Sequence, residues 1–147
     1  MKIYTIGFTK KSAENFFSVL EEQHIEALVD IRLNNTSQLA GFSRYPDLPY
    51  FLEKIIHVRY IQDPDFAPSK EMLRRFREGD INWDAYTLAY QKLLEERNIK
   101  DHIQEKYRDF LDKNICLLCS EDKADHCHRS LAAQEIKKQL GGEIINL

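Results

Sequence analysis

A short segment near the C-terminal end of the chain carries most of the side chains that could do chemistry. It contains the thiols of Cys119 and Cys127, the carboxylate of Glu121, and the imidazole and guanidinium of His128 and Arg129. The segment follows an apolar stretch typical of a buried strand and precedes an amphipathic stretch typical of a helix. Open α/β sheets bind ligands at this transition, and a helix N-terminus favours anions and lowers a thiol pKa. We therefore expect an active site here.

Cys127 is the expected nucleophile of this site, with Cys119 as the second choice. If Asp125 caps the final helix, Cys127 lies in the first turn beside unpaired backbone N–H groups. These groups and the neighbouring arginines favour the thiolate, and His128 or Asp30 then serves as acid, base or orienting group. The alternative is that both cysteines are structural, because free cysteines are among the most buried residues.

Two arginines suit the binding of an anionic substrate at the same edge of the sheet. Arg32 follows the apolar strand that ends at Asp30, and Arg129 lies at the start of the final helix. Guanidinium groups bind phosphates or carboxylates bidentately, although a salt bridge from Arg129 to Asp30 or Glu121 is the alternative. Asp30 itself is expected either to pair with an arginine or to have a raised pKa. Further substrate-binding side chains are expected at the strand ends and in the adjacent loop: Thr9, Asn34, Asn35, Ser37 and Glu121.

A metal site is another interpretation of the same segment. Cys119, Cys127 and His128 are zinc-ligand types, and a fourth ligand could come from the long loop, Asp30 or another histidine. Against this interpretation, adjacent residues at a helix start, such as Cys127 and His128, project about 100° apart. Cys116 and Cys119 have C-x-x-C spacing, but residues three apart in a strand face opposite sides. We therefore assign no metal ligand from the sequence, which leaves the cofactor unknown.

The periodicity of apolar residues predicts an α/β fold with a single domain over residues 1–147. Short apolar runs predict strands at residues 3–6, 27–31, 57–61, 115–119 and 143–147. Apolar residues at helical spacing predict helices that begin after Ser12 and Ser69, and helices near residues 49–56, 85–92, 103–111 and 131–140. We expect a mostly parallel five-stranded sheet with helices on both faces, in Rossmann-like order 3-2-1-4-5 or, alternatively, in flavodoxin-like order.

Composition indicates a globular, cytoplasmic protein. A net charge of −3 with 31% charged residues gives no support for broad electrostatic binding to nucleic acid or membrane. The cluster Arg74, Arg75 and Arg77 is expected to be a solvated helix face, with a phosphate-backbone contact as the alternative. No apolar run approaches the ~20 residues of a membrane span. Three cysteines imply free thiols rather than a disulfide framework, and His57 and His102 are interpreted as structural or surface residues.

Several motifs resemble the domain of unknown function 488 family. In chain order they are Tyr4–Gly7, Val29–Arg32, Leu33–Ser37, Leu39–Phe42, Ala67–Lys70, and Cys119 with Cys127–Arg129. The resemblance covers nearly the whole chain, and its closing Cys-His-Arg motif is specific. It implies a small cytoplasmic bacterial or archaeal α/β protein, and it assigns no activity. Many relatives have His-Ser after the first strand, where this chain has Phe8 and Thr9, so a mechanism through that histidine does not transfer.

These observations lead to three hypotheses about function. The first is an enzyme acting on an anionic, phosphate-bearing substrate, such as a nucleotide or nucleic-acid component, through an activated cysteine or aspartate. The second is a non-catalytic module that binds a nucleotide or a nucleic-acid end in the same pocket. The third is a Cys/His metal-binding protein. The sequence does not determine the substrate, the reaction or the oligomeric state.

Overall fold

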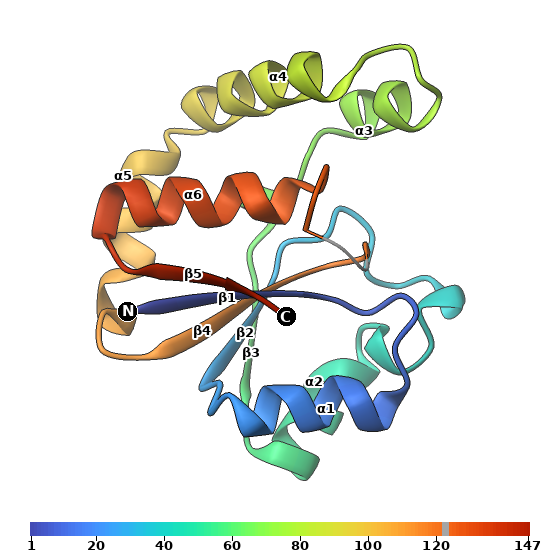
Figure 1. Cartoon of the computed structure of the whole chain (residues 1–147), viewed down its shortest axis with the longest axis vertical. Helices are drawn as coiled ribbons and strands as arrows, with labels where there is room; N and C mark the ends of the chain where they lie inside the picture. The colour runs from blue at the N-terminus through green and yellow to red at the C-terminus, as the bar shows by residue number, and fades with distance from the viewer. Residues whose placement is uncertain (122–123) are drawn as a thin grey trace.

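Five parallel strands form one sheet in the order β3-β2-β4-β1-β5 (Figure 1). The computed structural model describes residues 1–121 and 124–147. The strands are β1 (Lys2–Gly7), β2 (Ala27–Asp30), β3 (Arg59–Gln62), β4 (Asn114–Cys119) and β5 (Glu143–Asn146). Each strand coincides within a residue or two with a predicted apolar run, so the predicted α/β class and the set of strands are confirmed.

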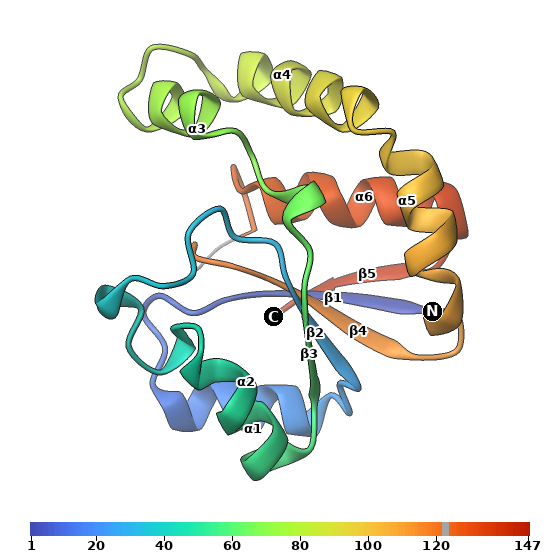
Figure 2. The same ribbon diagram turned by 180° about the vertical axis from the view of Figure 1, so that it is seen from behind.

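Six α-helices cover the two faces of this sheet. They are α1 (Ala13–Glu22), α2 (Asp47–Phe51), α3 (Lys70–Arg77), α4 (Trp83–Glu96), α5 (Ile99–Lys106) and α6 (His128–Leu140). A π-helical turn, Leu52–Ile56, continues α2, and short 3₁₀ turns occur at Gln38–Ser43, Pro64–Phe66 and Arg108–Phe110. Helices α1 and α2 lie on one face, and α3 to α6 lie on the other (Figures 1 and 2). The sheet is therefore buried on both faces, as parallel sheets require.

Helix starts follow the capping chemistry of the sequence. The Ser12 hydroxyl accepts a hydrogen bond from the Asn15 N–H at 3.1 Å, and the Ser69 hydroxyl accepts one from the Met72 N–H at 3.2 Å. Both contacts satisfy backbone donors that have no partner within the helix. The predicted starts of α1 and α3 are therefore confirmed.

Successive side chains of each strand point to opposite faces of the sheet, and this divides the apolar residues into two cores. In β4, Ile115 and Leu117 contribute to the core under α3–α6, whereas Cys116 and Leu118 contribute to the core under α1 and α2. Burial among apolar groups raises the pKa of the Cys116 thiol well above its ordinary value, so this cysteine is inert. The prediction that Cys116 and Cys119 face opposite sides is confirmed by the contact of Cys119 with α6.

The predicted strand order was wrong, in both the Rossmann-like and the flavodoxin-like form. Strand β4 pairs with β2 on one side and with β1 on the other, so it lies between the strands of the first βαβ unit. The long connection through α3, α4 and α5 carries the chain from β3 across β2 to this central place. As a result, β4 leads into α6 on one face while both of its neighbours lead into helices on the opposite face (Figure 2). Open α/β sheets bind ligands at the point where neighbouring strands lead to helices on opposite faces of the sheet.

Among the helices of the described residues, none combines the length and the hydrophobicity that a membrane-spanning segment requires.

Candidate functional site

The carboxyl edge of the sheet brings together most of the predicted site residues, in two adjoining clusters. The first, which we call the thiol cluster, consists of Cys119 at the end of β4 and of Cys127 and His128 at the start of α6. The second, which we call the Asp30 cluster, surrounds the carboxylate at the end of β2 and consists of Asp30, Arg32, Asn35, Ser43 and Tyr60.

The thiol cluster places three metal-ligand atoms close together. The sulfurs of Cys119 and Cys127 and a ring nitrogen of His128 all lie within 4.8 Å of one another, and all three residues are buried. The expected cap at Asp125 was wrong, because Cys127 is itself the N-cap and has an extended backbone with φ −124° and ψ 139°. The 100° divergence of adjacent helical residues therefore does not apply, and Cys127 Sγ lies 4.0 Å from His128 Nδ1.

His128 is held in one orientation by the neighbouring strand. Its Nε2 lies 2.8 Å from the carbonyl oxygen of Ile31, which can only accept, so Nε2 carries the proton. The lone pair of a neutral ring is then on Nδ1, the nitrogen that faces Cys127. Burial lowers the pKa of His128 to about 4. The charges of Arg129 and Arg77 also lower this pKa, and the hydrogen bond to Ile31 acts in the opposite direction. The imidazole is therefore neutral near pH 7.

Arg129 supports the cluster from the next position of α6. The residue is fully buried, and its Nη1 donates to Cys119 Sγ over 3.3 Å. Its Nη1 also donates to the Glu121 carbonyl oxygen, and its Nε lies 3.3 Å from the Thr5 hydroxyl. Arg129 thus contacts the backbone of Glu121, whereas the alternative considered from the sequence was a salt bridge to the carboxylate of Asp30 or Glu121. The buried guanidinium therefore holds the Cys119 sulfur and the Glu121 backbone in a fixed relation to the start of α6.

The prediction of three free thiols was wrong for two of them. The sulfurs of Cys119 and Cys127 are joined as a disulfide, and Cys116 is free. The Cα atoms of the joined cysteines are 7.8 Å apart, whereas disulfides usually span 4.4–6.8 Å. The Cα separation of this pair is therefore wider than that of an ordinary disulfide.

The Asp30 carboxylate is surrounded by donors. Arg32 donates from Nε and from Nη2, each at 2.8 Å, Tyr60 donates from its hydroxyl at 2.6 Å, and Asn35 Nδ2 lies at 3.2 Å. Arg32 also donates to the Ser43 carbonyl oxygen at 2.7 Å, which fixes the loop after β2. Burial and the Asp30 charge raise the pKa of Tyr60 well above its ordinary value, so its hydroxyl keeps its proton. These contacts make the cluster a support for the loop, and the predicted acid/base role of Asp30 and anion-binding role of Arg32 stay predictions.

Phe8 has a defined place beside this cluster. The guanidinium carbon of Arg32 lies 5.5 Å from the centroid of the Phe8 ring, a cation–π arrangement. The position at which many relatives have a histidine thus covers a buried cation in this chain.

The remaining predicted residues lie around the two clusters without joining them. Thr9 ties two strand ends together, because its hydroxyl donates to the Ser120 carbonyl oxygen at 2.8 Å. Asn34 and the Glu121 side chain are exposed, and Ser37 caps the following 3₁₀ turn by accepting from the Leu39 N–H at 3.2 Å. Substrate contacts by these four residues stay predictions.

Sequence reasoning missed Tyr60, Ser43 and the carbonyl of Ile31. Tyr60 and Ser43 come from β3 and from the 3₁₀ turn, and no local pattern links them to Asp30. The Ile31 carbonyl is a backbone group whose partner, His128, is 97 residues away. Only the packing of distant segments reveals these contacts.

His102 has partners that the sequence did not indicate. Its Nε2 lies 2.9 Å from an oxygen of the buried Asp63, and its Nδ1 lies 3.0 Å from Asp65. Tyr107 donates to Asp63 at 2.5 Å, and the Lys106 ammonium is 3.7 Å away. These donors satisfy Asp63, so the group ties the end of β3 to α5 and is a structural anchor.

The fold and the thiol cluster define a parallel α/β protein with a Cys/His site where neighbouring strands lead to helices on opposite faces of the sheet. Residues 12–136 match the family described as Domain of unknown function DUF488, and the chain belongs to this family. Searches of curated proteins and of solved structures found no match to the chain. Since the family description assigns no activity, the chemistry of the site is the basis for a functional assignment.

Proposed function

We propose that this protein is an enzyme that acts on an anionic substrate at a zinc centre formed by Cys119, Cys127 and His128. The observation that carries the proposal is that three buried donor atoms, two sulfurs and one imidazole nitrogen, converge within 4.8 Å. Two cysteines and one histidine are a ligand set of catalytic zinc sites, which keep the fourth position for water or substrate. A zinc ion held in this way lowers the pKa of a bound water to about 7 and polarises an ester oxygen.

The orientation of His128 supports the metal proposal. Histidine ligands of metals commonly donate their other ring N–H to a carbonyl or carboxylate, which fixes the tautomer and the ring. His128 makes this contact with the Ile31 carbonyl, and its Nδ1 faces the sulfur of Cys127. The lone pair of Nδ1 is therefore available to a metal ion shared with Cys127.

The spacing of the cysteines also supports a shared ligand. Two sulfurs on one tetrahedral zinc ion lie about 3.8 Å apart, given Zn–S bonds of about 2.3 Å. A Cα separation of 7.8 Å suits two sulfurs that point at a common ion. A dithiol reductant supplies the two electrons and two protons that convert the disulfide into two thiols, and these lose their protons when they bind the metal.

Positive charge around the cluster supports an anionic substrate. Arg129 is buried against Cys119, and the N-terminus of α6 begins at the cluster. Arg77, an exposed residue of α3, lies close enough for its charge to act on His128. An exposed guanidinium near a metal-ligand set suits a phosphate ester, the substrate class expected from the sequence.

Metal analysis of reduced protein tests the zinc centre. Protein expressed without a metal-binding tag and purified under reducing conditions is expected to contain about one zinc ion per chain. Cys119→Ser and His128→Ala are expected to lose it, because each removes a ligand atom. Cys116→Ala is the matched control, since it removes a thiol on the opposite face of the sheet and is expected to keep the zinc. Zinc-free wild-type protein, or variants that retain the metal, would contradict the proposal.

Turnover of a simple phosphate diester tests the enzymatic part separately. Bis(p-nitrophenyl) phosphate is expected to be hydrolysed by the zinc-loaded protein, with loss of activity on chelation and recovery on adding zinc. Arg77→Gln is expected to raise KM several-fold while kcat changes little, because Arg77 would bind the anion without touching the reacting atoms. Stoichiometric zinc without chelator-sensitive turnover would support the metal site and contradict the proposed enzymatic activity.

A redox pair is the second candidate, favoured by the disulfide between Cys119 and Cys127. Arg129 donates to Cys119 Sγ, so we propose Cys119 as the reactive cysteine of this pair, whereas the sequence favoured Cys127. Cysteine alkylation followed by mass spectrometry separates the two candidates. In reduced protein, alkylation that a chelator accelerates supports zinc, whereas fast alkylation of Cys119 with or without chelator supports a redox or nucleophilic thiol.

A further inference from the structure

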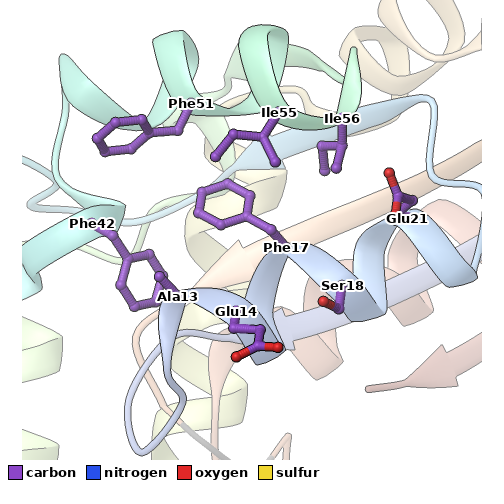
Figure 3. Close-up of a pocket in the computed structure, with 9 residues that line it drawn as sticks. All are labelled: Ala13, Glu14, Phe17, Ser18, Glu21, Phe42, Phe51, Ile55 and Ile56. Atoms are coloured by element: carbon purple, nitrogen blue, oxygen red, sulfur yellow. The ribbon is translucent and has the colours of Figure 1, made fainter.

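A second candidate site lies on the opposite face of the sheet from α6, between α1 and the helical segment of residues 47–56 (Figure 3). It is an open pocket of about 380 Å³, within the range of small-molecule sites. Neither cluster at the carboxyl edge contributes a residue to it. Nothing in the proposed zinc chemistry uses this pocket.

Aromatic and aliphatic side chains form the walls of the pocket. Phe17 of α1 points toward Phe51 and Ile55 on the opposite helical segment, and Phe42 lies at one end (Figure 3). The Phe17 ring centroid is 5.9 Å from that of Phe42 and 6.3 Å from that of Phe51. Ile55 is 52% exposed, an unusual position for so large an apolar side chain. The walls therefore suit the flat, apolar body of a small ligand.

The charged lining of the pocket is acidic. Glu14 and Glu21 both line it, and they lie two helical turns apart on the same face of α1. Both are exposed, and neither forms an ion pair or a side-chain hydrogen bond with another described residue. Among the described residues that line the pocket, none is a lysine, an arginine or a histidine. Two carboxylates beside aromatic rings favour a cation and disfavour an anion.

From these features we infer that the pocket binds a small, ring-containing ligand that carries an amine. The apolar ring would lie against Phe42, Phe51 and Ile55, and the ammonium group would pair with Glu14 or Glu21. This site is independent of the thiol cluster and adds a second ligand class to the anionic substrate proposed above.

Three probes that share one ring and one chain length test the inference. Tryptamine carries an ammonium group, tryptophol a hydroxyl and indole-3-propionate a carboxylate, so they differ mainly in charge. Titration calorimetry, supported by ligand-observed NMR, is expected to show tryptamine binding at least five-fold more tightly than indole-3-propionate, with tryptophol between them. Binding is expected to be unchanged when metal is removed with a chelator, because the thiol cluster does not reach the pocket.

Matched variants locate the binding. The double variant Glu14→Gln/Glu21→Gln is expected to abolish the preference for tryptamine, whereas Glu22→Gln, which changes an exposed carboxylate of α1 outside the pocket, is expected to keep it. Ile55→Asn is expected to weaken the binding of all three probes. Because Ile55 is exposed, the variant is expected to stay folded, which circular dichroism checks. Absence of binding, equal affinities for the three probes, or affinities that these variants leave unchanged would overturn the inference.

Discussion

Asp30→Asn is expected to lower the free energy of unfolding by about 3–5 kcal/mol, the range found when one partner of a buried ion pair is removed. Asp30 is 1% exposed and its partner Arg32 is 5% exposed, so neither charge is solvated. The substitution is nearly isosteric and leaves no cavity. Its cost comes from a guanidinium that stays buried without a counter-charge.

The neighbours of Asp30 add to this cost. The amide nitrogen of an asparagine is a donor, and it cannot satisfy the donors of Tyr60 and Asn35 that now meet a carboxylate oxygen. At least one buried donor would then lose its acceptor. The loop fixed by Arg32 and Ser43 is expected to loosen as a result.

Urea denaturation followed by circular dichroism measures the effect. Asp47→Asn removes the carboxylate of the surface pair with Arg44 and is expected to cost less than about 1 kcal/mol. The double variant Asp30→Asn/Arg32→Met is expected to recover part of the loss, because it also removes the unpaired charge. A loss at Asp30 as small as that at Asp47 would show that the buried pair does not support the loop.

Gly7→Ala is expected to destabilise the protein by about 3 kcal/mol, near the upper end of the range for overpacking. A Cβ at this position would lie 1.5 Å from the Glu121 carbonyl oxygen and 2.8 Å from Arg129 Nη1. The backbone of Gly7 is not in the left-handed region, so a glycine is required here only because there is no room for a Cβ atom. The backbone at Glu121 must move to admit a methyl group.

The substitution at Gly7 is also expected to affect the thiol cluster, because Arg129 contacts both the Glu121 carbonyl oxygen and Cys119. Displacing the Glu121 carbonyl removes an acceptor of Arg129, and the contact of its Nη1 with Cys119 Sγ changes with it. Groups that orient metal ligands typically change metal affinity about 10–100-fold when they are lost. Zinc affinity of Gly7→Ala is therefore expected to fall by such a factor, measured by competition with a chromophoric chelator.

Gly79→Ala serves as the control for both measurements. Gly79 has φ +78°, and no atom of a described residue lies within 4 Å of the position of a Cβ, so alanine there adds backbone strain of about 1 kcal/mol without such a clash. It is expected to keep full zinc affinity. Equal behaviour of the two variants would show that the tight approach of Gly7, Glu121 and Arg129 has no bearing on the cluster.

Patterns local in sequence were sufficient for the strands, for the starts of α1 and α3, and for the edge of the sheet that holds the site. They placed α5 too late in the chain, because the helix predicted near residues 103–111 is Ile99–Lys106 followed by a 3₁₀ turn at Arg108–Phe110. Ser12 and Ser69 begin helices because their hydroxyls accept from backbone N–H groups three residues on. Alternation in β4 assigned Cys116 and Cys119 to opposite faces. The parallel arrangement then placed Asp30, Cys119 and the start of α6 at one edge, because βα connections bring the carboxyl ends of strands together.

Tertiary structure decided which of these groups contact one another. The insertion of β4 between β2 and β1 placed the Ile31 carbonyl against His128, and this contact sets the direction of the imidazole lone pair. The donors of Asp30 include Tyr60, which is 30 residues away in sequence. The spacing of apolar residues along the sequence indicates which face of a helix or strand is buried, because residues on one face recur at the period of that element. The partner of a buried polar group depends on how distant elements pack, and no repeat within one element encodes it.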